Sequence, residues 1–395
     1  MKIESLKIKN FKAFKNAYMT KIPDFCVIVG ANGTGKSTIF SLFSFLKEAF
    51  TSNVNVALSK IGGPRGFQEV RSRNCKGPIE IEIQFREKIG KPLITYSIEI
   101  DESSGKAFVK REVLKYRRGR KGTPWHFLDF ANGKGIAVTN EVENIKDYSK
   151  LERRTETLKS PDILAIKGLG QFDSFPAVRT LANLIENWHI SDFHINKARP
   201  DQIYDYAEHL SKEGENLSIV IQYLYNYHRE IFEKILKALS NRIPGISKVE
   251  SKMTEEGRVL LRFKDESFED PFLSKYVSDG TLKMLAYLVL LYDPKPHPLL
   301  CVEEPENQLY PNLLHELAEE FREYSQRGGQ VFVSTHSPDF LNAIELEEVF
   351  WLEKENGYTK IVRAKNNAQI SEYMKAGDQM GYLWKQGFFG SVDPE

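Results

Sequence analysis

Cysteine is scarce in this chain of 395 residues, which contains three: Cys26, Cys75 and Cys301. They lie far apart and no two of them have CxxC spacing. The sequence therefore supports neither a disulfide framework nor a cysteine-based zinc site. Such cysteine usage is typical of the reducing cytoplasm, where we expect this protein to reside.

Long hydrophobic runs are also missing. The longest, residues 285–292, is far shorter than the ~20 residues that a transmembrane helix needs. The first residues mix charged and apolar side chains and lack the apolar core of a secretory signal. We therefore expect neither secretion nor a membrane partner.

Neither sign of charge is in excess, because 55 lysines and arginines face 54 aspartates and glutamates, for a net charge of +1. No global field attracts the chain to nucleic acid, so any contact with DNA has to be local. The 41% hydrophobic and 28% charged residues exclude disorder as the dominant state. Length predicts roughly two to three domains, or one nucleotide-binding domain with insertions.

The N-terminal part has the pattern of a strand, a loop and a helix, followed by an antiparallel ribbon. In order, we expect a strand with Leu6 and Ile8 on one face, a turn near Asn10, a fully buried strand at 25–30, a buried helix at 37–50, two strands within 79–100 with a turn near Gly90, a third strand at 108–117 and a basic loop at 115–122. Residues 125–200 mix short apolar pieces with turn residues, and their topology is not predicted.

The C-terminal part alternates helices with short apolar strands. We expect two helices between Gly214 and Pro244, then a helix at 279–292, a strand at 299–304, a helix at 311–327 and a strand at 330–337. This order predicts a parallel sheet covered by helices, with the chemistry at the carboxyl ends of its strands. The predicted division is an N-terminal ATPase lobe at 1–115, an irregular and then helical insertion at 116–245, and a C-terminal ATPase lobe at 246–395.

A phosphate-binding loop is the strongest motif. GANGTGKS at 30–37 matches the pattern GxxxxGK(S/T), and it lies between the buried strand and the helix that this motif requires. Successive backbone N–H groups there surround an anion, and glycine allows the tight curl. We expect Asn32, Gly33, Thr34, Gly35, Lys36, Ser37 and Thr38 to bind nucleotide, Lys36 to reach the β and γ phosphates and the Ser37 hydroxyl to ligate Mg²⁺. The alternative is a chance match in a glycine-rich turn.

Two acids end the next buried strand, in LLCVEEPENQLYP. Adjacent residues of a strand face opposite sides, so only one acid can lie over the metal. We assign Glu303 to the metal and Glu304 to activation of water. The alternative is an acidic helix N-terminus that begins at Pro305 and Glu306.

Two further candidates are weaker by themselves. His336 ends another buried strand, where it could bond the γ-phosphate or the attacking water, although a lone histidine there is more often structural. VSDGT at 277–281 precedes an apolar helix. Ser278 or Asp279 explains it as a helix cap, while the same amides could grip a phosphate held by a second subunit.

Together these segments resemble the ABC-type ATPase heads of the RecF/SMC/OLD-like group, and in particular the small bacterial AAA-type ATPases found with defence genes. The segments are LKIKNFKAF, GANGTGKST, GENLSIVIQYL, RIPGI, VSDGTLKMLAYLVLL, CVEEPENQLYP, STHSPDFLNAI and LWKQGFFG. The resemblance implies an α/β P-loop fold with a mixed sheet, an antiparallel ribbon and a helical insertion, and a homodimer that sandwiches two ATP molecules.

The resemblance also assigns roles to residues. Glu304 would be the catalytic base and His336 the switch histidine, while Ser278 and Gly280 would contact the γ-phosphate bound by the other subunit. Lys12 would approach the phosphates. Gln68 is the candidate for the glutamine loop, with Arg71 or Arg73 as possible contacts across the dimer.

Three departures from the family pattern limit the implied function. Glu303 stands where ABC proteins usually have Asp, and SDGT replaces the transporter-type SGG. The 395 − 336 = 59 residues after His336 are too few for the Toprim nuclease domain of OLD proteins. No heptad region for an SMC arm is present.

The favoured hypothesis is an Mg²⁺-dependent ATPase that dimerises on ATP and gates a separate effector, such as a nuclease or toxin, in antiphage defence. The alternative is a RecF-like DNA-repair ATPase, in which KYRRGRKG and the Arg153–Arg154 pair contact phosphates; a solvated loop is the preferred explanation of that run. A nucleotide-switched scaffold with negligible turnover is the third hypothesis.

Overall fold

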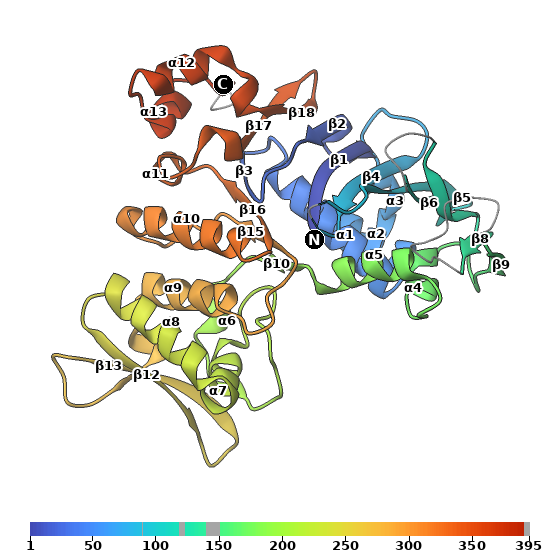
Figure 1. Ribbon diagram of the computed structural model, residues 1–395. Coiled ribbons are helices and arrows are strands. Elements are labelled where there is room, and N and C mark those ends of the chain that lie inside the picture. Colours follow the sequence, from blue (N-terminus) through green and yellow to red (C-terminus); the bar gives the residue numbers. More distant parts are fainter. Residues whose placement is uncertain (89, 118–122, 140–150, 391–395) are drawn as a thin grey trace.

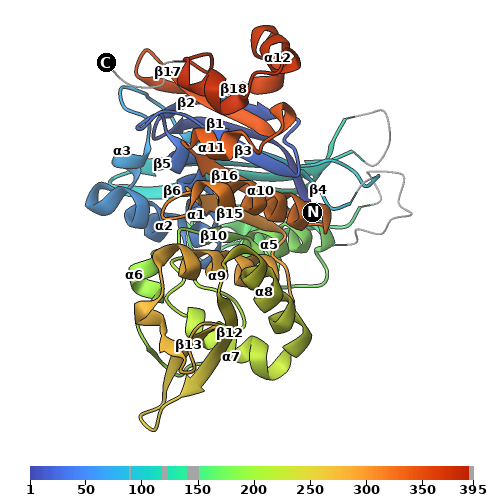
Figure 2. The ribbon, with the colours of Figure 1, turned by 90° about the vertical axis from the view of Figure 1, so that its left-hand side faces the viewer.

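The computed structural model describes residues 1–88, 90–117, 123–139 and 151–390, and within them the strands form three sheets (Figure 1). A large antiparallel sheet lies beside a mainly parallel one, and a smaller sheet with two helices forms a separate projection (Figures 1 and 2). None of the helices in these ranges is long and apolar enough to cross a membrane. The predicted mixed α/β architecture is confirmed.

The antiparallel sheet has eight strands, more than the expected ribbon. In spatial order they are β2 (Phe14–Thr20), β1 (Lys2–Phe11), β4 (Ile79–Arg86), β5 (Ile94–Ser103), β6 (Lys106–Tyr116), β7 (Trp125–Ala131), β8 (Lys134–Val138) and β9 (Arg153–Thr157). β4 alternates buried and partly exposed residues along its whole length, as a sheet with one covered face does. The predicted turn near Asn10 lies two residues later, at Lys12 and Ala13.

The parallel sheet carries the expected strand–helix alternation. Its order is β10 (His189–Ser191), β15 (Leu299–Glu303), β16 (Gln330–Thr335), β3 (Phe25–Val29), β17 (Val349–Glu355) and β18 (Tyr358–Arg363), with only β18 antiparallel to its neighbour. Every residue of β3 is buried, because helices or strands cover both faces. The first residues after β3, β15 and β16 therefore meet at one edge of the sheet.

Helices fill the space around these sheets. They are α1 (Lys36–Thr51), α2 (Val54–Gly62), α3 (Phe67–Val70), α4 (Ala165–Leu169), α5 (Pro176–Asn187), α6 (Ile195–Ala198), α7 (Leu217–Tyr227), α8 (Arg229–Arg242), α9 (Asp279–Leu291), α10 (Pro311–Gln326), α11 (Pro338–Leu341), α12 (Ala368–Lys375) and α13 (Met380–Lys385). The helices predicted after residues 36, 214, 278 and 310 are all present. Together with α7 and α8, the strands β11 (Gln202–Ile203), β12 (Ile246–Met253), β13 (Arg258–Asp265) and β14 (Phe272–Leu273) form the projection.

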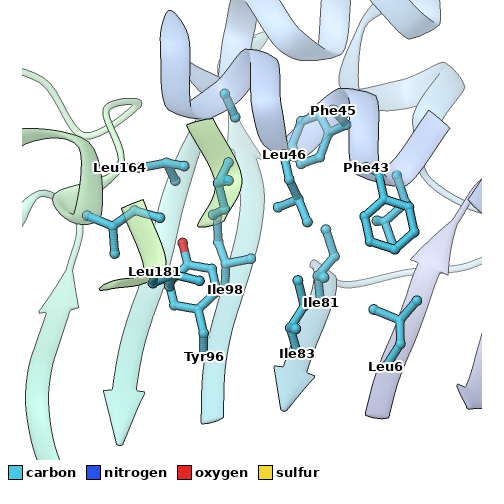
Figure 3. Close-up of a cluster of buried hydrophobic side chains, with 14 of the residues drawn as sticks. Leu6, Phe43, Phe45, Leu46, Ile81, Ile83, Tyr96, Ile98, Leu164 and Leu181 are labelled. Atoms are coloured by element: carbon cyan, nitrogen blue, oxygen red, sulfur yellow. The ribbon is translucent and has the colours of Figure 1, made fainter. Parts of the chain in front are cut away.

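The helix after the phosphate loop lies between the two large sheets and joins their cores. Phe43, Phe45 and Leu46 of α1 face Ile81 and Ile98 of the antiparallel sheet (Figure 3). The Phe43 ring also packs on Phe332 of β16, with ring centroids 5.3 Å apart. Burying a large apolar side chain of this kind contributes about 1.5–3 kcal/mol, so α1 has a fixed position from which to present its N-terminus.

A buried glutamate, Glu112, anchors residues 165 and 166, which lie within the region 125–200 whose topology was not predicted. Glu112 of β6 accepts hydrogen bonds from the N–H groups of Ala165 (2.6 Å) and Ile166 (3.1 Å) and from the Tyr96 hydroxyl (3.1 Å). Burial raises the pKa of Glu112 to about 7. Leu164 and Leu181 then cover Tyr96 and its neighbours (Figure 3).

The predicted lobe boundaries at 115 and 245 stay a prediction. Within the predicted insertion, β7, β8 and β9 extend the antiparallel sheet and β10 joins the parallel one. Of the predicted basic loop, Lys115 and Tyr116 belong to β6, and residues 118–122 lie outside the described residues.

Candidate functional site

The phosphate loop connects β3 to α1 in a conformation that only glycine adopts easily. Gly33 and Gly35 have φ angles of 74° and 104°, in the left-handed region. A Cβ at Gly30 would lie 2.4 Å from Thr34 Oγ1, so glycine is required there by space as well. The loop leads directly into the N-terminus of α1, whose free N–H groups favour an anion.

Lys36 folds back over this loop. Its Nζ donates to the carbonyl oxygens of Gly30 (2.7 Å) and Ala31 (3.4 Å) and lies 4.0 Å from Glu304 Oε1. The side chain is 6% exposed, and burial lowers the pKa of Lys36 while Glu304 opposes this shift. A buried ammonium that faces loop carbonyls fits an incoming phosphate, because the anion would replace neutral acceptors with charged ones.

Ser37 and Glu303 form the second part of the site. Glu303 is the last residue of β15, and a hydrogen bond from Ser37 joins it to the first turn of α1. Burial raises the pKa of Glu303, and this hydrogen bond acts in the opposite direction. A hydroxyl and a carboxylate are the oxygen donors that Mg²⁺ prefers, so the pair fits the predicted metal role.

Glu304 turns away from Glu303 because the backbone changes direction at the end of β15. Its φ angle is 41°, and its N–H donates to Ser334 O on the neighbouring strand (3.0 Å). Its Oε1 lies 3.2 Å from His336 Nδ1, and its Oε2 accepts from the Asn307 amide (3.1 Å). The structure thus brings Lys36, Glu303, Glu304 and His336 to one edge of the parallel sheet.

Glu306 is a member of this group that the sequence analysis missed. Its Oε1 accepts from Thr335 Oγ1 (2.7 Å) and from the His336 N–H (3.0 Å), and lies 3.5 Å from His336 Nδ1. Its Oε2 is buried and has no hydrogen-bond partner among the described residues. The alternative of a helix that begins at Pro305 is wrong, since the next helix begins at Pro311.

Lys283 and Asp192 are two further charged residues that act on the acids of this site, and the sequence analysis missed both. Lys283 of α9 is 3% exposed, and burial lowers its pKa while the charges of Glu306 and Asp192 raise it. Asp192 follows β10 and is among the charges that raise the pKa of Glu303. The signal available in the sequence was a lysine within an otherwise apolar helix, a position that a charge occupies only with partners.

Lys12 lies on the α1 side of the group. Its Nζ donates to Ser41 Oγ (3.4 Å), and its N–H donates to Val70 O (2.6 Å). Burial lowers the pKa of Lys12, and Glu303 is the charge that raises it. Its position is compatible with the phosphate contact that the resemblance implied.

Gln68 is not brought into this group by any contact among the described residues. It lies exposed on α3, where Arg71 stacks on Phe67 and Arg73 pairs with Glu69 at 3.4 Å. Its assignment to a glutamine loop stays a prediction, as do the contacts of Arg71 and Arg73 across a dimer.

Ser278 caps the N-terminus of α9. Its Oγ accepts from the Thr281 N–H at 3.2 Å, and Ser278 itself is exposed at the surface. Gly280 follows, where a Cβ would lie 3.0 Å from Gln308 O. The capping role is therefore present in the single chain. The contact with a second subunit's nucleotide stays a prediction.

The C-terminal hairpin touches the phosphate loop. The Thr359 hydroxyl of β18 donates to Thr34 O, and the Thr359 N–H donates to Ala13 O (2.9 Å). The hairpin thus joins the loop to the turn between β1 and β2.

Comparison with known proteins agrees with this geometry. Residues 25–342 match a family described as "AAA domain, putative AbiEii toxin, Type IV TA system". Old nuclease of Escherichia phage P2 is 26% identical over 208 residues, 41% of this chain and 35% of the nuclease. The chromosome partition protein Smc of Methanococcus voltae is 27% identical over 246 residues, 54% of this chain and 20% of Smc. The chain thus spans about a third and a fifth of these two relatives.

Solved structures show the same fold. A crystal structure of an SmcHead bound to the C-winged helix domain of ScpA has a TM-score of 0.57 at 16% identity and covers 92% of this chain and 98% of its own. An Smc head with an extended coiled coil, bound to a ScpA domain from Pyrococcus furiosus, gives 0.53 at 14% identity, with 94% and 99% covered. The predicted ABC/SMC-head-like fold is confirmed, and the family match over most of the chain shows that this protein belongs to the AAA-domain family and has an SMC-head-like ATPase fold.

Proposed function

We propose that the chain binds ATP with Mg²⁺ and hydrolyses it, and that ATP assembles two copies face to face. The observation that carries the proposal is the convergence of Lys36, Ser37, Glu303, Glu304 and His336 at one edge of the sheet. Lys36 lies 4.0 Å and His336 lies 3.2 Å from Glu304, and Ser37 is hydrogen-bonded to Glu303. Five residues from three separate parts of the chain meet here with the chemistry that phosphoryl transfer to water needs.

Each residue has a distinct task in this proposal. The loop amides and Lys36 hold the phosphates, and Ser37 with Glu303 would hold the metal, which neutralises developing charge when it is bound. Glu304 accepts a proton from the attacking water through Oε1. His336 and Asn307 hold the Glu304 carboxylate from either side, at 3.2 and 3.1 Å.

The position of α9 supports the proposed dimer. Ser278 is exposed at the N-terminus of α9, and Asp279 and Gly280 behind it are partly exposed, which places this helix end within reach of a second molecule. A phosphate bound by one chain would then be completed by α9 of the other. The site would be formed fully only in the ATP-bound dimer.

The experiment that tests these two steps is the replacement Glu304→Gln, which keeps the side-chain shape and removes the base. We expect hydrolysis to fall at least ~100-fold, with a dimer stable in MgATP by native mass measurement. Glu256→Gln is the matched control, since that side chain is 84% exposed. Unchanged hydrolysis in Glu304→Gln would exclude Glu304 as the base. If the parent chain also hydrolyses ATP slowly, the same result would favour the nucleotide-switched scaffold.

We further propose that the dimer gates a separate effector in antiphage defence. The likeness to Old nuclease, the AbiEii description of the family, and the SmcHead structure with its bound ScpA domain support a head that acts through another protein. Purification of the Glu304→Gln chain with MgATP from cells that express its neighbouring genes tests this. Recovery of a second polypeptide in ATP-dependent amounts supports gating, and recovery of a bare dimer opposes it.

A DNA-binding ATPase is the second candidate, and one surface feature favours it. A groove of about 480 Å³ on β1 and β2 is lined by ten residues: Lys7, Lys9, Asn10, Lys15, Asn16, Tyr18, Asn74, Cys75, Lys76 and Glu80. Glu80 is the one acid among these ten, and within the described residues Lys9 is the lysine of the groove that pairs with it, at 2.6 Å. The groove is therefore locally basic although the whole chain is nearly neutral.

The test of DNA binding is its salt dependence. The double replacement of Lys7 and Lys15 by Gln should weaken binding to duplex DNA and reduce the slope of affinity against salt by about two. Arg153→Gln and Arg154→Gln, on the edge strand β9, test in the same way whether the predicted Arg153–Arg154 pair contacts DNA phosphates. Binding that is insensitive to salt would remove this candidate.

A further inference from the structure

Three metal-ligating side chains converge at the amino end of the parallel sheet, opposite the edge that carries the phosphate loop. His209 lies before α7, Asp293 follows the C-cap residue of α9, Tyr292, and His297 precedes β15. One ligand atom from each lies within 4.8 Å of the others. His209 Nδ1 is 2.6 Å from Asp293 Oδ2, and the Asp293 side chain is 5% exposed.

His297 has the protonation pattern of a metal ligand. Its Nδ1 lies 2.9 Å from Asn187 O, and a carbonyl oxygen only accepts hydrogen bonds, so Nδ1 carries the proton. In the neutral ring Nε2 therefore holds a lone pair, and this atom is buried with no hydrogen-bond partner in the part of the chain that the structure describes. Metal-bound histidines commonly have this arrangement, in which the second nitrogen donates to a backbone carbonyl.

His189 packs against this cluster from β10. The residue is 7% exposed, its ring stacks on His297 with centroids 4.8 Å apart, and its Nε2 is also buried without a partner among the described residues. His209 packs on His297 from another direction, at 5.0 Å. Buried polar atoms almost always have partners, and an absent ion is a known reason when they do not.

Charges of both signs act on the cluster. Burial lowers the pKa of both His189 and His297. The hydrogen bond with Asp293 raises the pKa of His209, so a metal ion has to displace the proton that these two side chains share. The nearby Lys47 has its Nζ bonded to Trp188 O at 2.6 Å.

We propose that His209, Asp293 and His297 bind one divalent transition-metal ion of the zinc class. Two imidazole nitrogens and one carboxylate oxygen suit Zn²⁺, whereas Mg²⁺ prefers oxygen ligands alone. Ligand atoms that share a tetrahedral metal at about 2.0–2.2 Å lie roughly 3.3 Å from one another. The hydrogen-bonded His209–Asp293 pair at 2.6 Å therefore has to open, and the wider spacings, up to 4.8 Å, have to close. His209, whose side chain is 38% exposed, has the freedom to make most of this movement.

The positions of the three proposed ligands in the chain indicate a structural role for the bound ion. Asp293 follows the last turn of α9, and the helix begins at the Ser278 cap. His297 leads into β15, which ends at Glu303. Over the 13 residues of α9 the two ends are roughly 20 Å apart. A bound ion would therefore fasten the far end of α9 to the strand that carries the two catalytic-site acids.

Cobalt binding by the full chain tests the proposal without using ATPase activity. The chain is freed of metal with a chelator and titrated with Co²⁺ in the absence of nucleotide, and visible absorption is followed, because Co²⁺ with nitrogen ligands in low coordination absorbs strongly. We expect one equivalent to bind, Zn²⁺ to displace it, and Zn²⁺ to raise the unfolding temperature. Failure of the parent chain to bind either ion overturns the proposal.

Matched variants locate the ion. Asp293→Asn and His209→Ala should each weaken Co²⁺ binding at least ~10-fold. His315→Ala, at an exposed position of α10, should leave it unchanged. Glu303→Gln should also leave it unchanged, which separates this site from the nucleotide site. Equal Co²⁺ binding by the parent, Asp293→Asn and His209→Ala chains would overturn the assignment. We expect the His209→Ala chain to fold, because the His209 side chain is 38% exposed.

Discussion

Removal of Glu306 tests whether one buried carboxylate sets the position of His336. Oε1 of Glu306 accepts from Thr335 Oγ1 at 2.7 Å and from the His336 N–H at 3.0 Å. Hydrogen bonds to a charged group contribute about 1.5–3 kcal/mol each, so the replacement Glu306→Ala loses roughly 3–6 kcal/mol. Removing Oε2, which has no hydrogen-bond partner among the described residues, offsets about 1–3 kcal/mol of this loss. Taking the lower values together and the upper values together, the net destabilisation is roughly 2–3 kcal/mol.

The assay combines urea unfolding with ATP hydrolysis. Thr335→Val removes one of the two donors and should cost about half as much stability as Glu306→Ala. Glu306→Gln keeps an acceptor oxygen and should stay closer to the parent chain. If Glu306 positions His336, Glu306→Ala should lower the hydrolysis rate at least ~10-fold, because small displacements at a reacting centre are costly. Nucleotide affinity should change less than the rate.

Two results would refute this reasoning. If Glu306→Ala unfolds at the same urea concentration as the parent chain, the carboxylate does not hold this turn. If Glu306→Ala is destabilised but hydrolyses ATP at the parent rate, Glu306 supports the fold and does not position His336.

Three further predictions concern the phosphate loop, the buried lysine and the buried acid. Gly35→Ala places a side chain at φ 104° and should weaken nucleotide binding ~10-fold or more, measured by calorimetry. Lys283→Met removes the buried positive charge near Glu306 and should lower the free energy of unfolding by about 1–3 kcal/mol, measured in urea. Burial raises the pKa of Glu112 from 4.5 to about 7 in the folded chain. The stability that Glu112 contributes is therefore fully present below pH 4.5 and is lost as the pH rises to about 7. At about 1.36 kcal/mol per pH unit, the loss in the free energy of unfolding is roughly 3 kcal/mol. Urea unfolding at pH 5 and pH 8 should show that loss in the parent chain, and Glu112→Gln should abolish it.

The core of the site was predictable because its chemistry is local in sequence. Gly30 to Ser37 follows a buried strand and opens a helix, and Glu303 with Glu304 ends another. Short apolar runs with glycine or acids directly behind them predict both the element and the edge at which the polar groups lie. The structure places these segments as the sequence indicated.

The missed parts depend on pairing between distant segments. Glu306 meets His336 because β15 and β16 are neighbours, with Glu303 opposite Ser334, and nothing near residue 306 in the sequence records that register. Residues 125–200 are held through contacts such as Glu112 with Ala165, and β10 is only three residues long. Periodicity cannot identify elements so short, whose positions are set by what they pack against.

The hydrogen bond from Thr359 to Thr34 connects nucleotide binding to the C-terminal segment. The family match ends at residue 342, whereas β17, β18, α12 and α13 lie beyond it. β17, α12 and α13 belong to the same C-terminal segment as Thr359. This segment is therefore hydrogen-bonded to the phosphate loop although it lies outside the family match, so replacing Thr359 removes a contact of the loop from a position beyond residue 342.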